Sequence, residues 1–218
     1  AGRTEQVSME QKKKGFSVGK ALMLLGVVLL LGAAGLYGYN QMVDQRAGQE
    51  SEAAVITLVE EIQTSEVEIL EVPEEEGEED AAILKVAELD GAYYMGVLTI
   101  PTLEKILPVQ SDWSDAKLKK SPCRYSGGLE DGELVIAGHN YKKHFSGLAT
   151  LKQGDSIVFT DLEGNQLFYE DREIYTVAAT DIEGMINSGY DLSLFTCNYG
   201  GKARVTVRCD RVEAVVQE

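Results

Sequence analysis

The sequence predicts a mainly β domain, either a closed barrel or a sandwich, that follows a single apolar helix near the N-terminus. Three observations support this prediction. Short strand-like runs alternate with glycine-containing turns through residues 91–218. An uncharged apolar run occupies residues 21–39. Between these two regions, residues 40–90 are rich in glutamate and contain no aromatic residue, which is typical of a solvated connecting segment.

The strand-like runs are short, are rich in β-branched and aromatic residues, and are bounded by turn signals. Many short strands at such spacing favour a barrel or sandwich. The sequence contains no glycine-rich phosphate loop, so a nucleotide-binding fold has no support. One or two short helices are expected at residues 114–120 and 146–151. The runs cover residues 95–100, 133–137, 156–160, 166–169, 173–178, 192–196 and 203–208.

The chain carries an excess of acid, with 36 acidic residues, 20 basic residues and a formal net charge of −16. Such a surface repels a phosphate backbone, so nucleic acid is excluded as a partner. The acid is concentrated, because residues 71–80 alone contain seven acidic residues. A run of like charge repels itself and stays solvated, so we interpret residues 40–90 as a spacer, with a helix at residues 53–69. A calcium site is disfavoured because no loop with alternating ligands is present.

The apolar run at residues 21–39 follows a basic cluster of Lys12, Lys13, Lys14 and Lys20. A helix of this length crosses about 30 Å of hydrocarbon. Basic residues stay on the cytoplasmic side, so we expect the N-terminus in the cytoplasm and the rest of the chain outside. A cleaved secretory signal is the alternative, and it exports the domain as well. The predicted segments are a cytoplasmic basic tail (1–20), a membrane anchor (21–39), an acidic and helical linker (40–90) and a folded catalytic domain (91–218).

The three cysteines are Cys123, Cys197 and Cys209, and an odd number leaves at least one thiol unpaired. No CxxC pair occurs and the chain has only two histidines, so a structural zinc site is disfavoured and no cofactor is expected. Cys197 is the strongest candidate for a nucleophile. It ends the run Leu-Ser-Leu-Phe-Thr-Cys, and the turn Asn-Tyr-Gly-Gly follows, where a substrate can reach a thiol. A buried core cysteine is the alternative.

His139 and Arg204 are the candidate partners of Cys197. His139 follows the run Leu-Val-Ile-Ala-Gly, whereas His144 lies in a lysine-rich loop and is expected on the solvated surface. Arg204 begins the alternating run Arg-Val-Thr-Val-Arg, seven residues after Cys197, so a hairpin would return its guanidinium toward the thiol. Arg208 lies on the same face and competes with Arg204 for this place, and a surface ion pair is its alternative interpretation.

A cysteine, a histidine and an arginine at strand ends suit acyl transfer. The thiolate is the nucleophile, and an adjacent imidazolium favours that form. Attack on a carbonyl creates an oxyanion, which a preorganised guanidinium can stabilise; one such donor contributes about 3 kcal/mol. The histidine then protonates the leaving amine and later deprotonates the incoming one.

The sequence resembles the sortase family of cysteine transpeptidases. Leu-Phe-Thr-Cys at residues 194–197 is similar to the family's TLxTC signature, and Ala-Gly-His-Asn at residues 137–140 is similar to its catalytic-histidine loop. Arg-Val-Thr-Val-Arg at residues 204–208 resembles the arginine-bearing final strand. These motifs occur in the family's order over residues 96–216. Two further similar stretches are residues 107–109 and 145–155.

The resemblance implies an eight-stranded β-barrel with short helices, preceded by a single transmembrane helix. It implies an extracytoplasmic enzyme of the Gram-positive cell envelope that cleaves an LPxTG-like sorting signal between Thr and Gly, through a thioester on Cys197. The partners are surface proteins that bear a sorting signal, and an amine of a cell-wall precursor or a pilin lysine. His139 is the implied general acid/base and Arg204 the implied oxyanion and substrate clamp. The implied substrate-binding residues are Thr196, Asn140 and Arg208.

Several alternatives stay open at the level of sequence. The subclass is not fixed: a class B-like enzyme is considered, and the lack of a second apolar segment or of a lid upstream of Leu107 counts against a pilin polymerase. Cys209 is not part of the family's pattern, and a disulfide with Cys123 is one interpretation of it. A cysteine peptidase that releases its product to water and a non-catalytic scaffold are the competing functions. By analogy, residues 179–190 form one wall of the substrate groove.

Overall fold

A computed structural model describes residues 18–73, 83–130, 132–178, 180–197 and 201–213. The chain divides into two compact units, Ala1–Met42 and Val43–Glu218. Helix α1 (Val18–Thr64) contributes to both units. The lysines at positions 12–14 and the acidic run at residues 74–80 lie outside the described residues, so the predictions that rest on them stay predictions.

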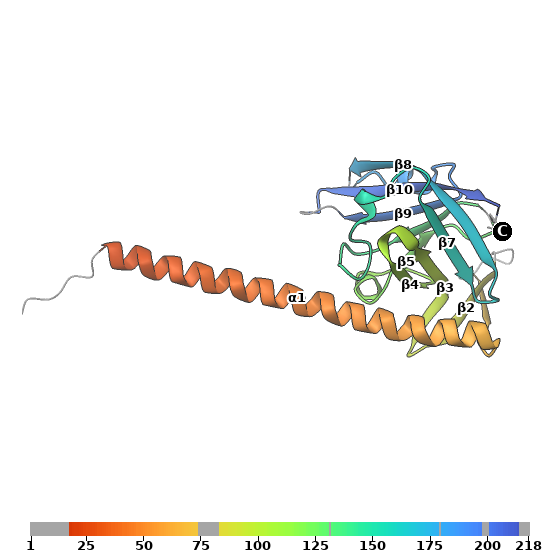
Figure 1. Ribbon diagram of the computed structural model, residues 1–218, viewed down its shortest axis with the longest axis horizontal. Helices are drawn as coiled ribbons and strands as arrows, with labels where there is room; N and C mark the ends of the chain where they lie inside the picture. Colours follow the sequence, from red (N-terminus) through yellow and green to blue (C-terminus); the bar gives the residue numbers. More distant parts are fainter. Residues whose placement is uncertain (1–17, 74–82, 131, 179, 198–200, 214–218) are drawn as a thin grey trace, which may run out of the picture. The chain divides into compact units, whose positions relative to one another are not determined.

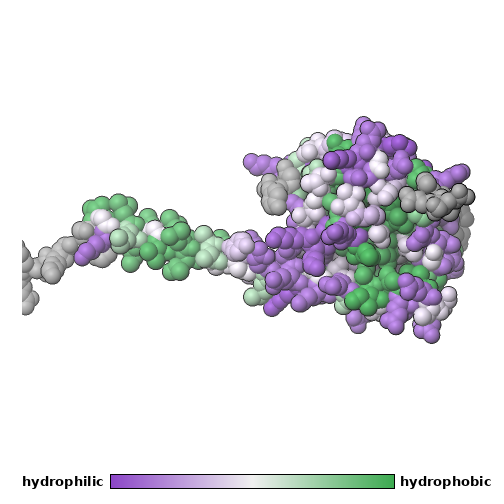
Figure 2. All heavy atoms as spheres, in the orientation of Figure 1, coloured by the Kyte–Doolittle hydropathy of each residue, from purple (hydrophilic) through white to green (hydrophobic). Residues whose placement is uncertain are grey.

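In the first unit, the apolar part of α1 has the length and composition of a membrane-spanning helix. Its large hydrophobic side chains are exposed, and Figure 2 shows them as a dense apolar surface on this segment. Soluble proteins rarely expose a continuous apolar surface of this kind, so it marks a segment that contacts lipid or protein. The structure thus confirms the predicted apolar helix as a candidate membrane anchor.

The second unit contains a closed β-barrel of eight strands (Figure 1). Neighbouring strands around it follow the order β3, β4, β5, β6, β9, β10, β8, β7, and the pairing of β7 with β3 closes the ring. The predicted mainly β, eight-stranded barrel is therefore confirmed. The strands are β3 (Ala92–Ile100), β4 (Lys105–Gln110), β5 (Cys123–Ser126), β6 (Leu134–Ala137), β7 (Ser156–Asp161), β8 (Gln166–Ala178), β9 (Leu192–Cys197) and β10 (Ala203–Val212).

The observed elements differ from the sequence prediction in a few places. The two runs expected at residues 166–169 and 173–178 form one strand, β8. β4 was not among the predicted runs, and only residues 107–109 were considered a strand end; the strand contains Pro108, which has no N–H to donate. Pro108 pairs with Val97 of β3, whereas β4 pairs with β5 only at Gln110 and Cys123, so the side of Pro108 that faces away from β3 has no ladder partner. The short helices are α2 (Asp115–Leu118), α3 (Glu183–Ile186) and the 3₁₀ turns η1 (Pro101–Leu103) and η2 (Leu148–Thr150).

Part of the predicted linker belongs to the same compact unit as the barrel. The second half of α1 buries Leu58 against Ala92 and Val97 of β3 and against Leu162. The helix predicted at residues 53–69 is therefore the last part of α1, and it ends at Thr64 rather than at residue 69. After α1, the chain forms a hairpin of β1 (Leu70–Pro73) and β2 (Ile83–Leu89), and β2 pairs with β3.

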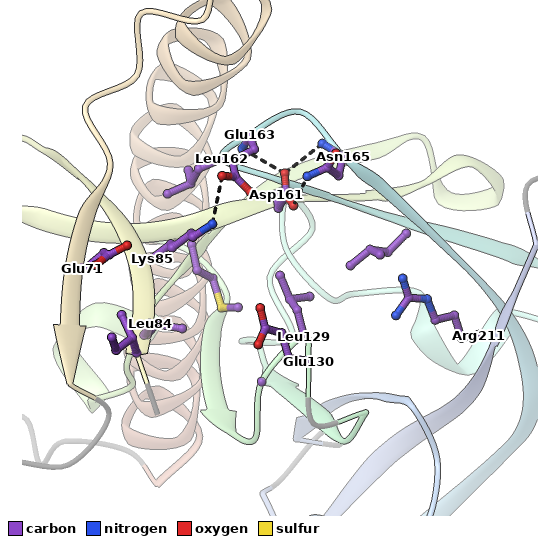
Figure 3. Close-up of a pocket in the computed structure, with 14 residues that line it drawn as sticks. Glu71, Leu84, Lys85, Leu129, Glu130, Asp161, Leu162, Glu163, Asn165 and Arg211 are labelled. Carbon is purple, nitrogen blue, oxygen red and sulfur yellow. Dashed lines mark hydrogen bonds and ion pairs between the residues drawn. The ribbon is translucent and has the colours of Figure 1, made fainter. Parts of the chain in front are cut away.

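A pocket of about 660 Å³ lies between this hairpin, the β7–β8 turn and Arg211 (Figure 3). Four of the polar residues that line it bond to one another, namely Lys85, Asp161, Glu163 and Asn165. The Asp161 carboxylate accepts hydrogen bonds from the backbone N–H groups of Glu163 and Asn165. Lys85 forms an ion pair with Glu163 at 2.9 Å. None of the candidate catalytic residues lines this pocket, so the chemistry of the chain must be sought elsewhere.

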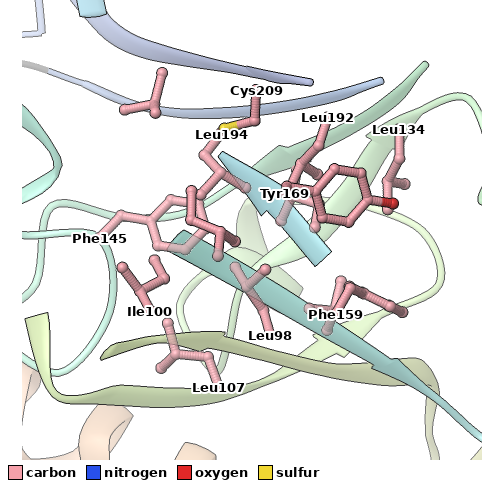
Figure 4. Close-up of a cluster of buried hydrophobic side chains, with 14 of the residues drawn as sticks. Leu98, Ile100, Leu107, Leu134, Phe145, Phe159, Tyr169, Leu192, Leu194 and Cys209 are labelled. Atoms are coloured by element: carbon pink, nitrogen blue, oxygen red, sulfur yellow. The ribbon is translucent and has the colours of Figure 1, made fainter. Parts of the chain in front are cut away.

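The barrel interior is filled by one cluster of aliphatic and aromatic side chains (Figure 4). Because successive side chains of a strand point to opposite faces, Leu192 and Leu194 of β9 point inward together with Val207 of β10. The alternate residues of the same strands point outward. This alternation decides which residues of β6, β9 and β10 are available on the outer face.

Candidate active site

The strand register brings Cys197 and Arg204 together. In the antiparallel pair of β9 and β10, Arg204 is the direct partner of Cys197. Directly opposite residues of such a pair have Cβ atoms about 5 Å apart and point to the same face. Cys197 is exposed and Arg204 is half-buried. The hairpin predicted from the sequence is therefore present, although its turn at residues 198–200 lies outside the described residues.

The parallel pairing of β6 with β9 brings His139 to the same end of the sheet. Ala137 pairs with Phe195, and the N–H of Gly138 donates to the carbonyl oxygen of Phe195 at 3.0 Å. His139 lies two residues beyond Ala137, and Cys197 lies two residues beyond Phe195. Cys197 thus ends β9, and His139 follows the adjacent end of β6.

Gly138 is required by the packing on the inner side of this strand end. A Cβ atom at position 138 would lie 2.5 Å from the ring of Phe145, which is itself fully buried in the barrel core. Only glycine lets the backbone run this close to the ring. The Phe145 ring therefore limits where the backbone can run after β6, and this sets the position of the His139 backbone.

The His139 imidazole is partly withdrawn from water. Its ring stacks on that of Tyr141, with ring centroids 4.7 Å apart. Burial, with a smaller contribution from the nearby Lys119 charge, lowers the pKa of His139 below its ordinary value. Nε2 is buried and has no hydrogen-bond partner among the described residues. A neutral imidazole with an unpartnered nitrogen can accept a proton at neutral pH.

An aromatic and aliphatic cluster forms the floor beside these residues. Phe195 packs with Val135, Ala137 and Met185 on the outer face. Tyr125 meets the Phe195 ring edge-on at 5.2 Å. The guanidinium of Arg204 lies over the Phe195 ring, 5.1 Å from its centre. This cation–π contact preorganises the Arg204 side chain beside Cys197.

Arg208 lies on the same face as Arg204 but has a different environment. Its side chain is completely buried, so the alternative interpretation of an exposed surface ion pair is wrong. Its Nε donates to the Tyr175 hydroxyl at 3.0 Å, and its Nη1 donates to the Met185 carbonyl at 3.1 Å. It also donates to Ser193 Oγ and to the Gly184 carbonyl. Arg208 thereby fastens α3 to the sheet.

The predicted substrate-binding residues differ in how accessible they are. Thr196 is buried, and it pairs with Val205, so its side chain points to the face opposite Cys197. Asn140 follows His139 and is half-buried. The structure thus places Asn140 beside the histidine, whereas Thr196 and Arg208 are enclosed by protein and do not share the exposed position of Cys197.

The remaining thiols and the second histidine are buried. Cys123 and Cys209 are free and inaccessible, so the interpretation of a disulfide between them is not supported. Burial raises the pKa of the Cys123 thiol to about 12, which makes it unreactive. His144 is fully buried, so its expected place on the solvated surface is wrong. The prediction was based on the lysines next to His144. Lys142 and Lys143 are exposed, but the His144 side chain points into the protein interior.

Sequence reasoning also missed the aromatic side chains around the site. Tyr141 stacks on His139, and Tyr125 links Phe195 to Trp113, whose ring centroid lies 5.3 Å away. The only signal for Tyr141 was its position two residues after a candidate catalytic histidine. Tyr125 and Trp113 come from a different part of the chain, and no local pattern connects them to Cys197.

The strand pairing brings Cys197, Arg204 and the strand end before His139 to one end of the sheet. The sortase domain family matches residues 98–212, and the chain therefore belongs to the sortase family. Family membership and fold together support a cysteine transpeptidase function. No curated protein matches the chain.

Solved structures of sortases resemble this chain. Sortase C1 from Streptococcus agalactiae is 29% identical, with a TM-score of 0.52 over 58% of this chain and 72% of that one. Sortase C1 from Streptococcus suis is 26% identical, with a TM-score of 0.50 over 56% and 75%. Sortase A from Corynebacterium diphtheriae shares the fold at 19% identity, with a TM-score of 0.52 over 84% and 98%. These similarities span more than one sortase class and do not determine the subclass.

Proposed function

We propose that this protein is a membrane-anchored transpeptidase. It cleaves an LPxTG-like sorting signal and transfers the threonine acyl group to an amine. The main support for the proposal is the pairing register of β6, β9 and β10, which is consistent with a nucleophile, a base and a cation at one edge of the sheet. Cys197 and Arg204 are direct cross-strand partners, and His139 leaves the neighbouring strand end. The resemblance of residues 194–197 to the family signature supports the choice of Cys197.

In the first half of the reaction, the Cys197 thiol loses its proton to His139 and the sulfur attacks the carbonyl carbon of the signal's threonine. The resulting oxyanion receives hydrogen bonds from the Arg204 guanidinium, which the Phe195 ring holds in place. His139 then donates its proton to the leaving glycine nitrogen, the C–N bond breaks, and a thioester remains on Cys197.

In the second half, an amine enters where the glycine left. His139 accepts a proton from this amine as its nitrogen attacks the thioester carbonyl. The C–S bond breaks, the new amide forms, and the proton returns to the Cys197 sulfur. The amine of a cell-wall precursor or a pilin lysine are the two nucleophiles considered. The partners are then surface proteins that carry a sorting signal.

The anchor supports a location at the cell membrane. The apolar part of α1 is long enough to span a bilayer, and the basic residues before it favour a cytoplasmic N-terminus. The catalytic domain would then face the outside, where sorting signals emerge and the cell wall is assembled. Thr196 and Arg208 would support the site from within, whereas Asn140 borders the space beside His139.

A two-nucleophile assay tests this function. The full chain in detergent is incubated with an LPxTG peptide, alone and with excess triglycine, and the products are identified by mass spectrometry. We expect a thioester on Cys197 and a triglycine adduct of the peptide cut after threonine. Cleavage that yields only the free acid in the presence of triglycine would favour the peptidase alternative. No thioester across a library of proline-containing sorting peptides would contradict the proposal.

A further inference from the structure

The loop that carries His139 is held between the barrel and helix α1. On the barrel side, the N–H of Phe145 donates to the His139 carbonyl at 3.1 Å, and the Phe145 ring is buried in the core. On the other side, α1 contributes a contact face within the second unit. Asp44, Ala47, Gly48 and Ser51 form this face, because the spacing i, i+3, i+4, i+7 places them on one side of a helix.

A hydrogen bond from the loop backbone to α1 fixes the outer side of the loop. The N–H of Lys142 donates to Asp44 Oδ1 at 2.8 Å. The carbonyl of the same residue accepts a hydrogen bond from Lys105 Nζ at 2.6 Å. Lys142 is thus held from two directions, by α1 and by β4. Its position is three residues after His139, so this contact restrains the loop close to the catalytic side chain.

Gly48 lets the helix approach the loop closely. A Cβ atom at position 48 would lie 2.6 Å from Cγ and 3.0 Å from Cβ of Lys143. Any larger residue would therefore push the stem of Lys143, and the loop with it, away from α1. The ion pair of Lys143 with Glu52 is long at 3.9 Å and exposed, so it adds little. Close packing at Gly48 is the stronger constraint.

A chain of rings connects this contact to His139. Ala47 of α1 and His144 of the loop are both buried, and the Ala47 backbone raises the pKa of His144 against the larger lowering by burial. The His144 ring lies 5.4 Å from that of Tyr141, and Tyr141 stacks on His139. A displacement of the loop by α1 is therefore transmitted through Tyr141 to the orientation of the catalytic imidazole.

We propose that Asp44 and Gly48 of α1 are positioning residues for His139, so that the part of α1 after the predicted anchor completes the active site. The inference rests on the proposed role of His139 as the general acid/base. Neither residue contacts the reacting atoms. Both act through the loop, and they belong to the segment that begins five residues after the predicted anchor ends at Tyr39. The part of the chain interpreted as a spacer thus also positions the proposed general acid/base.

Four variants of the full chain in detergent test the proposal. Gly48→Leu wedges the loop away from α1, and Gln49→Leu, on the exposed side of the same helix, is its matched control. Asp44→Ala removes the acceptor of the Lys142 N–H, and Asp44→Asn keeps an acceptor oxygen. We expect Gly48→Leu to lower kcat about 10- to 100-fold with KM within about twofold, because small misplacements of a catalytic group have effects of this size. Asp44→Ala lowers kcat less, Asp44→Asn restores it, and Gln49→Leu has no effect.

An NMR titration of the two histidines separates this proposal from the assigned function. With histidine labelled, wild type shows two resonances, one for His139 and one for His144. Gly48→Leu is expected to raise the His139 pKa toward its ordinary value, because the displaced ring becomes hydrated. This result supports the coupling even if the chain transfers no peptide. An unchanged His139 titration together with unchanged kcat in folded Gly48→Leu and Asp44→Ala would overturn it.

Discussion

The two sides of the active site are built by different means. Cys197 and Arg204 lie on one hairpin, where backbone hydrogen bonds between β9 and β10 set their relative position. His139 lies on a loop, where the buried Phe145 ring, Tyr141 and the distant helix α1 set its position. The positions of the nucleophile and the cation thus depend on strand register, whereas the position of the base depends on tertiary packing. Changes on the two sides should therefore have different signatures.

The largest effect is expected from Cys197→Ala on the register side. This change removes the nucleophile, and transfer activity should fall by at least about 10⁴-fold, as in other enzymes that lose their nucleophile. The thiol is exposed and ends its strand, so the midpoint of thermal unfolding should stay within about 2 °C of wild type. The measurements are product formation and circular dichroism. Residual activity near that of wild type would show that another group is the nucleophile.

The two outward arginines of β10 should separate catalysis from stability. Arg204→Ala removes the proposed oxyanion donor, and kcat/KM should fall about 10²- to 10³-fold with stability unchanged. Arg208→Ala leaves buried carbonyl and hydroxyl acceptors without their donor, and should lower the free energy of unfolding by about 2–4 kcal/mol. Urea unfolding and steady-state kinetics measure both variants. Two results together would show that Arg208 rather than Arg204 serves the reaction. Arg208→Ala would be folded but inactive at low temperature, and Arg208→Lys would be fully stable.

On the loop side, the buried His144 should make stability depend on pH. Burial lowers its pKa to about 4, with the charges of His139 and Lys105 acting in the same direction and Asp44 opposing them. The unfolded chain then binds more protons below pH 6.5. The contribution of His144 to the free energy of unfolding should be fully present above pH 6.5 and fall by about 3 kcal/mol as the pH decreases to 4. His144→Phe lacks this contribution, so the difference in stability between the variant and wild type in urea unfolding should change by about this amount over the same range. Equal slopes for both proteins would contradict the assignment.

The smallest effect is expected at Asp171 on β8, which has the opposite sign. Its carboxylate is buried without a hydrogen-bond partner among the described residues, and burial raises its pKa to about 6. The folded chain therefore binds the proton more tightly, and stability is lost as the pH rises from 4 to 6. Asp171→Asn should raise the free energy of unfolding at pH 7 by up to about 2 kcal/mol. A destabilised variant would show that the carboxylate has a partner in solution.

The same contrast explains how much the sequence predicted. The strand runs and the short separation of Cys197 from Arg204 are local features, so the barrel class and this half of the site followed from pattern. His139 was predicted from its strand end and its resemblance to the family loop. Its supports were not, because Asp44 and Gly48 lie almost a hundred residues away. Likewise, the burial of Arg208 depends on α3 folding over it, and no alternation within β10 distinguishes it from Arg204.

The most direct test of the central claim is a crystal structure of the thioester on Cys197 in a His139→Ala variant, formed at alkaline pH from an LPxT peptide that carries a C-terminal thioester. Exchange of a thiolate with such a peptide needs no protonated leaving amine, so the acyl enzyme can form without His139. We predict a bond from the Cys197 sulfur to the threonine carbonyl carbon. The carbonyl oxygen should lie within hydrogen-bond distance of the Arg204 guanidinium, and the space left by His139 should face the sulfur. An acyl oxygen bound by other groups, with Arg204 directed away and the site of His139 remote from the sulfur, would contradict the account.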